Sequence, residues 1–114
     1  MARYFEFETS PYDAKFVFEL TDETKIAHVL KILSGEEKDK VHVIGRIKVG
    51  RKSYNPNLDF YMDPDSIDFF EVSIEVCDAT TNYVNDHLDE AGGAFLPGYV
   101  WCPWSSKVTR EVTP

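Results

Sequence analysis

Apolar and polar residues alternate with a period of two in several short stretches of the chain, which is the pattern of a β-strand with one buried face. The clearest case is the stretch 70–76, where four apolar residues alternate with Glu, Ser and Glu. Gly45 interrupts another apolar stretch, which indicates a bulge or the close approach of a second segment. The predicted strands are 3–8, 14–20, 41–49, 58–62, 70–76 and 107–112.

A period near 3.6 predicts two helices. The first covers 23–34, after an N-cap at Thr21 or Asp22 and before the stop residue Gly35. The second covers 79–90, with Asp78 as its N-cap and two glycines after it.

Strands and helices do not alternate regularly, so the pattern favours an α+β fold rather than a parallel α/β fold. We expect a single domain, 1–114, in which a mainly antiparallel β-sheet is packed with two α-helices. The strands 14–20 and 70–76 should pack against both helices in one core. The residues expected to be almost fully buried are Phe18, Ile74 and Leu88.

The charge balance excludes some classes of partner. The chain has 114 residues, with 12 Lys and Arg against 20 Asp and Glu, for a formal net charge of −8. We therefore expect no nucleic-acid binding, which needs a basic face, and no docking on an anionic membrane. No apolar run is long enough to span a bilayer. Arg3 is followed directly by a predicted strand, so we see no signal-peptide pattern at this end.

Two cysteines, Cys77 and Cys102, allow one pairing. They are either two separate buried thiols or a disulfide that ties the late loop to the core. The Gly- and Pro-rich segment between them favours the disulfide, which would close a loop of about 25 residues and contribute roughly 3 kcal/mol. An oxidising compartment follows from that pairing, so we expect a secreted or extracellular protein rather than a cytoplasmic one.

The loop 92–104 is rich in aromatic residues and prolines. Such a segment is either core filling, with Phe95, Trp101 and Trp104 beneath the second helix, or a restrained binding loop. Both hold if the base of the loop is buried and its tip, residues 96–99, is exposed. The candidate binding residues are Phe95, Leu96, Pro97, Gly98, Tyr99, Trp101 and Trp104.

A cluster of acidic residues around His87 gives an alternative. Asp86, Asp89 and Glu90 follow or precede this histidine within the predicted helix 79–90. Such a group is either a solvated acidic face with a structural histidine, or a catalytic or metal site. No second histidine or cysteine has the spacing of a metal ligand, so we expect no metal and no cofactor. The stretch 63–68 resembles the start of a calcium loop, but it lacks the glycine and glutamate of one and predicts a capped turn.

Several segments are similar to one known family. It consists of small proteins that resemble the N-terminal domain of a slime-mould-type calmodulin-binding protein, and the resemblance covers about 14–112. It implies secretion of many members and no catalytic residues. The segments are Tyr54-Asn55-Pro56, Asp63-Pro64-Asp65-Ser66-Ile67, Glu75-Val76-Cys77-Asp78-Ala79, Asp86-His87-Leu88-Asp89-Glu90, Gly92-Gly93-Ala94-Phe95-Leu96-Pro97-Gly98 and Trp101-Cys102-Pro103-Trp104-Ser105-Ser106.

Calmodulin itself is a poor partner for this chain, because it grips basic amphipathic helices and neither predicted helix is basic. We predict a non-catalytic binding domain that acts on a protein partner through the loop 92–104. A peptidase inhibitor is the most concrete form of this prediction. The alternative is a small enzyme or metal-dependent protein that uses His87 with Asp86, Asp89 or Glu90. A cleft lined by His87 would favour the alternative, and an exposed tip with His87 packed away would favour binding.

Overall fold

Segments near the two ends of the chain pair in the first sheet. The computed structural model describes residues 2–71 and 76–114. In it, β1 (Arg3–Glu8) lies between β2 (Phe16–Leu20) and β9 (Lys107–Val112), and both pairings are antiparallel. These bounds confirm the predicted first and last strands.

The long strand β3 (His42–Val49) organises the second sheet. Its first residues pair with β5 (Asp68–Phe70), its middle with β8 (Val100–Trp101) and its last with β4 (Phe60–Met62), all antiparallel. A short 3₁₀ helix, η1 (Pro64–Ser66), separates β4 from β5. A Cβ atom on Gly45 would lie 2.9 Å from the side chain of Met62, so the predicted close approach at this glycine is confirmed.

Aromatic rings join the two sheets into one core. Phe7 and Phe16 of the first sheet lie 5.6 and 5.1 Å from the ring of Trp101 in the second. The ring of Phe16 also lies 5.2 Å from that of Phe60. All four side chains, and Phe18 as predicted, are fully buried. The α+β class with mainly antiparallel sheets is confirmed.

The first helix matches its prediction to the residue. α1 (Glu23–Ser34) begins after Asp22, whose carboxylate accepts hydrogen bonds from the N–H groups of Thr24 and Lys25. It ends at Gly35, whose φ of 88° is left-handed. Neither α1, with 12 residues, nor the shorter second helix is long enough to cross a membrane.

The second helix is much shorter than predicted. α2 (Thr81–Asp86) has six residues and begins after Thr80, so Asp78 as its N-cap was wrong. The Asp78 carboxylate accepts instead from the backbone N–H of Trp104 at 2.8 Å. Leu88 lies past the end of α2 and is half-buried rather than almost fully buried.

The strand predicted over 70–76 is shown only at its start. Phe70 ends β5, and residues 72–75, including Ile74, lie outside the described residues. Val76 lies in a turn with 71% of its surface exposed, so it does not continue a buried face as predicted.

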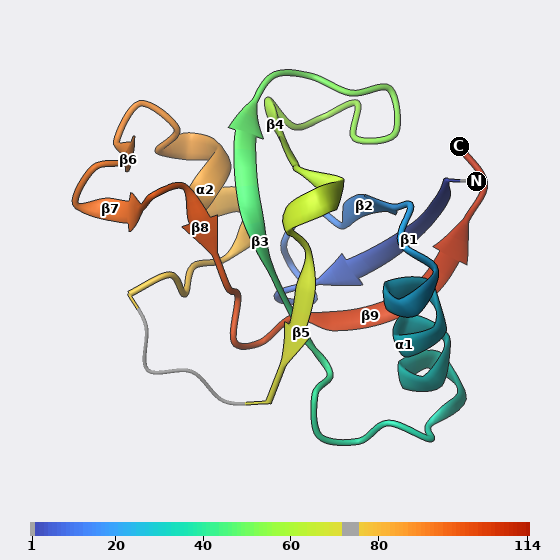
Figure 1. The fold of residues 1–114 in the computed structure, drawn as a ribbon. Coiled ribbons are helices and arrows are strands. Elements are labelled where there is room, and N and C mark those ends of the chain that lie inside the picture. Colours follow the sequence, from blue (N-terminus) through green and yellow to red (C-terminus); the bar gives the residue numbers. More distant parts are fainter. Residues whose placement is uncertain (1, 72–75) are drawn as a thin grey trace.

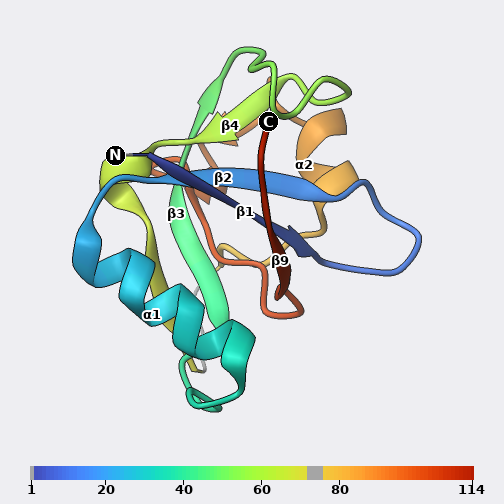
Figure 2. The ribbon, with the colours of Figure 1, turned by 90° about the vertical axis from the view of Figure 1, so that its right-hand side faces the viewer.

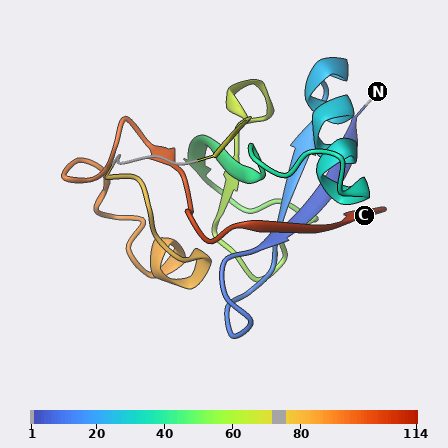
Figure 3. The same cartoon turned by 90° about the horizontal axis from the view of Figure 1, so that it is seen from below.

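The chain termini and the late loop lie at opposite ends of the molecule. Figures 1 and 3 show both termini beside β1 and β9, whereas β6 (Ala91–Gly92), β7 (Phe95–Pro97) and α2 lie at the far side. Figure 2 looks onto the end that carries the termini, with α1 on one flank and α2 on the other. The helices therefore do not cover one sheet together, although Ile26 and Val29 of α1 and Val84 of α2 belong to the same core.

Candidate functional site

The tip of the loop 92–104 is a tight turn. The N–H of Tyr99 donates to the carbonyl of Leu96 at 2.9 Å. Leu96, Gly98 and Tyr99 have φ values of 47°, 66° and 64°, all in the left-handed region. For a residue other than glycine this backbone costs about 1–2 kcal/mol, so surrounding contacts must hold Leu96 and Tyr99 in place.

Four contacts supply that restraint. The Leu96 side chain is fully buried, and the N–H of Ile47 in β3 donates to the carbonyl of Tyr99 at 2.8 Å. The Tyr99 ring lies directly against Gly92, where an added Cβ would be 2.5 Å from a ring carbon. The predicted disulfide between Cys77 and Cys102 is present, with 5.1 Å between the Cα atoms. The turn is thus fixed on both sides by the core.

The disulfide sits within a backbone connection of its own. The N–H of Cys102 donates to the carbonyl of Cys77 at 2.8 Å, and the Trp101 indole N–H donates to the carbonyl of Ala79 at 2.9 Å. Both cysteines are buried. A buried disulfide points to an oxidising environment rather than the cytosol.

The predicted loop residues divide into buried and exposed sets. Trp101 is fully buried, so the base of the loop is core, as one of the two interpretations required. Pro97, Gly98 and Tyr99 are exposed, which confirms an exposed tip at these residues. Leu96 was expected at that tip, and this was wrong, because its left-handed backbone turns the side chain into the core.

The other two aromatic residues of the loop lie between these extremes. Phe95 is half-buried beside α2, with its ring 5.4 Å from that of Tyr83. Trp104 is exposed, so its expected place in the core beneath the second helix was wrong. The backbone N–H of Trp104 is held by Asp78, which leaves its ring at the surface.

An apolar hollow lies beside the exposed tip. It has a volume of about 340 Å³ and is lined by Ile44, Val76, Cys77, Pro97 and Val100. Sequence reasoning missed Ile44, Val76 and Val100, since each was assigned to a strand or left in an unassigned segment. The disulfide and the exposed Val76 place an apolar surface next to Pro97 and Tyr99.

A second hollow lies on the α2 side of the same loop. Its volume is about 380 Å³, and its lining residues are Asp78, Ala79, Thr80, Tyr83 and Phe95. Tyr83 was expected in a buried stripe of the helix, but half of its surface is exposed. This correction follows from the shortness of α2, which has only a small buried face at Thr81 and Val84.

His87 is held by its own helix rather than by the acidic residues around it. Its Nδ1 lies 2.8 Å from the carbonyl of Tyr83, so Nδ1 carries the proton and donates, and its ring stacks on that of Tyr83 at 4.0 Å. Asp86, Asp89 and Glu90 are exposed. Among residues 2–71 and 76–114, no three His, Cys, Asp or Glu side chains are grouped for metal binding. This arrangement matches a structural histidine on a solvated acidic face.

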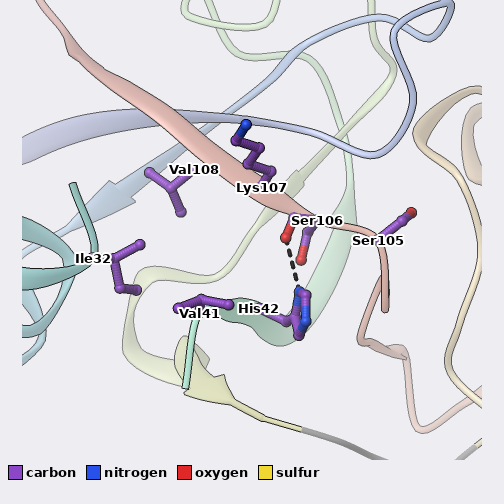
Figure 4. Close-up of a pocket in the computed structure, with 7 residues that line it drawn as sticks. All are labelled: Ile32, Val41, His42, Ser105, Ser106, Lys107 and Val108. Atoms are coloured by element: carbon purple, nitrogen blue, oxygen red, sulfur yellow. Dashed lines mark hydrogen bonds between the residues drawn. The ribbon is translucent and has the colours of Figure 1, made fainter. Parts of the chain in front are cut away.

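The largest of the hollows described here lies elsewhere, between α1, the start of β3 and the start of β9 (Figure 4). Its volume is about 480 Å³, and Ile32, Val41 and Val108 give it apolar walls. His42 lies in it with Nδ1 2.9 Å from the carbonyl of Ser106, so this nitrogen donates. Sequence reasoning gave His42 no role because its neighbours in this hollow are distant in sequence.

The Ser106 hydroxyl beside His42 is not an activated nucleophile. It is buried, donates to the carbonyl of Pro103 at 2.6 Å and accepts from the N–H of Val43 at 2.9 Å. Figure 4 shows the Lys107 side chain extending away from His42. A Ser–His pair for covalent catalysis requires a hydroxyl that donates to the imidazole, and here that proton is used elsewhere.

The turn predicted at 63–68 is confirmed. The Asp63 carboxylate accepts from the N–H of Asp65 and caps η1. Asp68 forms an ion pair with Lys25 at 2.7 Å. Partial burial alone would raise the pKa of the Asp68 carboxyl, but the hydrogen bonds from Lys25 and the Phe69 N–H outweigh it and lower that pKa. These carboxylates serve the turn and its ion pairs.

The family can be assigned from the whole chain. A model of one N-terminal domain family, named after a calmodulin-binding protein, matches residues 1–114. The chain belongs to this family. The predicted resemblance is thereby confirmed, and the match extends to both ends of the chain. No curated protein and no solved structure is similar enough to match. The family name gives no activity for the domain itself, so the function has to be argued from the loop and the hollows beside it.

Proposed function

We propose that the chain is a non-catalytic domain that binds a protein partner through the loop 92–104. The observation that carries the proposal is the turn at 96–99, whose exposed Pro97, Gly98 and Tyr99 are flanked by fully buried residues. Leu96 on one side and Trp101 on the other anchor it in the core. A tip of this kind keeps one conformation before it meets a partner.

Restraint of the tip favours affinity. Ordering a flexible side chain at an interface costs about 0.5–1.5 kcal/mol, and a preformed loop avoids much of that cost. Tyrosine is also among the residues that most often dominate interface energies. The apolar hollow beside Pro97 offers the partner a surface that excludes water, so Tyr99 and this hollow together form the proposed contact.

The peptidase-inhibitor form of the proposal assigns the key role to Tyr99. An inhibitor must place an exposed side chain in the specificity pocket of the enzyme, and the Leu96 side chain is buried in the core. Tyr99 is 42% exposed and lies at the end of the turn. We also propose that the protein acts outside the cell, which the buried disulfide supports.

A capture experiment with matched tyrosine variants tests the proposal. The immobilised protein is exposed to extract and medium from its native source, and captured proteins are identified by mass spectrometry. Tyr99→Asn removes the ring and suits a left-handed backbone. Tyr12→Asn is the control, because Tyr12 is 92% exposed and lies in the turn between β1 and β2.

The expected result is a partner captured by the unmodified protein and by Tyr12→Asn but weakened by about thirtyfold with Tyr99→Asn, the change for a side chain worth about 2 kcal/mol. Inhibition is measured in parallel against serine, cysteine, aspartic and metallopeptidases. Partners that bind Tyr99→Asn and Pro97→Ala as tightly as the unmodified protein would refute the loop as the binding site.

A further inference from the structure

Three rings beside the second hollow leave one aromatic face open. His87 stacks on Tyr83 with centroids 4.0 Å apart and planes 18° apart. The Phe95 centroid lies 5.4 Å from that of Tyr83 and 6.2 Å from that of His87, nearly perpendicular to both planes. These three distances place Phe95 beside the edge of the stack, almost at a right angle to the stacking direction. Phe95 therefore does not cover the face of Tyr83 that is turned away from His87.

The second hollow lies on that open side. Tyr83 and Phe95 line it and His87 does not, so the wall that Tyr83 contributes is on the side away from the stack. The Asp78 carboxylate stands in the same lining, and the hydrogen bond from the Trp104 N–H fixes one of its oxygens. The hollow thus combines two aromatic rings and a positioned carboxylate within about 380 Å³.

The charge of the surrounding chain is strongly negative. Between residues 53 and 106 the sequence contains ten Asp and Glu and no Lys or Arg. Asp86 ends the helix that carries Tyr83, Asp89 and Glu90 follow shortly after it, and all three are exposed. A positively charged group that approaches this side meets attraction from the hollow and from the residues near it in the chain.

We propose that this hollow binds the guanidinium group of an arginine side chain from a protein partner. Guanidinium is planar, so it stacks on an aromatic face and at the same time donates two N–H groups to a carboxylate. The Tyr83 face and Asp78 offer those two kinds of contact in one hollow. The proposal rests on the proposed function only in its assumption that the arginine belongs to a protein partner.

Small-molecule titration tests the site without any partner. Uniformly ¹⁵N-labelled protein is titrated with N-acetyl-arginine N-methylamide, and amide chemical shifts are followed by NMR. N-acetyl-citrulline N-methylamide is the control ligand, because it has the same shape and no charge. The expected result is a saturating shift of amides at 78–83 and at Phe95 with the arginine compound, and at least tenfold weaker binding of the citrulline compound.

Variants connect these shifts to the two contacts. Asp78→Asn keeps an oxygen for the Trp104 N–H and removes the charge, and Tyr83→Leu removes the ring. Each should weaken binding at least threefold, while Tyr83→Phe should preserve it. Asp65→Asn and Tyr12→Leu are matched controls on exposed residues elsewhere and should bind normally. Thermal melts show that each variant is folded, and if Tyr83→Leu does not fold, Asp78→Asn carries the test.

Three results would overturn the inference. Equal binding of the arginine and citrulline compounds would remove the role of charge, and normal binding by Asp78→Asn would remove the carboxylate. Equal or tighter binding of the corresponding lysine compound would contradict the assignment to arginine. None of these results concerns Tyr99, whereas a Tyr99 variant that keeps its partner would refute the proposed loop and leave this titration unchanged.

Discussion

Loss of the disulfide should weaken the domain strongly without unfolding it. Cys77 and Cys102 are 25 residues apart, and closing a loop of this length restricts the unfolded chain by about 3.5 kcal/mol in the chain-entropy relation. Unfolding entropy for 114 residues is roughly 0.24 kcal/mol/K, so the double variant Cys77→Ala, Cys102→Ala should melt about 15 °C lower. The aromatic core and the hydrogen bond between the Cys102 N–H and the Cys77 carbonyl remain, so a folded domain is expected.

Calorimetry of the oxidised protein, the reduced protein and the double alanine variant measures this difference. Reduction changes no side chain, so agreement between the reduced protein and the variant separates loss of the bond from loss of packing. A melting temperature lowered by less than about 4 °C, near 1 kcal/mol, would refute the reasoning. Two free thiols in the denatured, unreduced protein would contradict the bond itself. Where a partner is available, both forms should also bind it more weakly, because the tip regains entropy.

Three further changes probe the loop, a buried hydroxyl and the core. Gly92→Ala should lower the free energy of unfolding by about 2 kcal/mol or more, because φ is 89° and the new Cβ meets the Tyr99 ring; Gly93→Ala, whose nearest atom is 3.6 Å away, should change it by less than about 0.5 kcal/mol, and equal effects in thermal melts would contradict this. Burial raises the pKa of Tyr54 to about 12, so the stability it supports is present below the unfolded pKa of about 10 and is lost as pH rises toward 12. Absorbance at 295 nm should show one of six tyrosines ionising late, a feature absent in Tyr54→Phe, and simultaneous ionisation of all six would contradict it. Trp101→Leu should cost about 3–5 kcal/mol in urea denaturation, because the ring is fully buried among three phenylalanines, and a loss below about 1 kcal/mol would show that the core does not depend on it.

Elements with complete local signals were predictable from the sequence. α1 has an aspartate cap, an apolar stripe and a glycine stop within its own residues, and its observed bounds match the prediction. β9 likewise follows the prediction over Lys107–Val112. The disulfide was accessible because two cysteines allow only one pairing, and the choice between a bond and free thiols was decided by the fold.

The second helix failed because its ends depend on distant residues. Asp78 has the side chain of a good N-cap, but the backbone of Trp104, 26 residues later, takes its carboxylate. At the other end, Asp86, Asp89 and Glu90 would place negative charge at the negative pole of a longer helix, which disfavours it. Neither effect is part of the apolar periodicity from which the helix was predicted.

The direction of side chains at the loop could not be read from composition. Leu96 stands beside Pro97 and Gly98, a sequence typical of an exposed turn, yet its left-handed backbone directs it into the core. Tyr83 matched an apolar stripe, but the shortened α2 leaves it half-exposed. The three-ring arrangement with His87 required the spatial approach of Phe95, which the spacing of residues along the chain does not indicate.

The position of the two chain ends has a consequence for avidity. Both ends lie beside β1 and β9, at the far side of the molecule from β6 and β7. A tether on either end therefore leaves the loop 92–104 directed away from the attachment point. Two copies joined through their ends would present two loops on opposite sides, and a partner with repeated sites could engage both at a raised effective concentration. The same orientation would hold for a copy anchored to a surface, whichever end is attached.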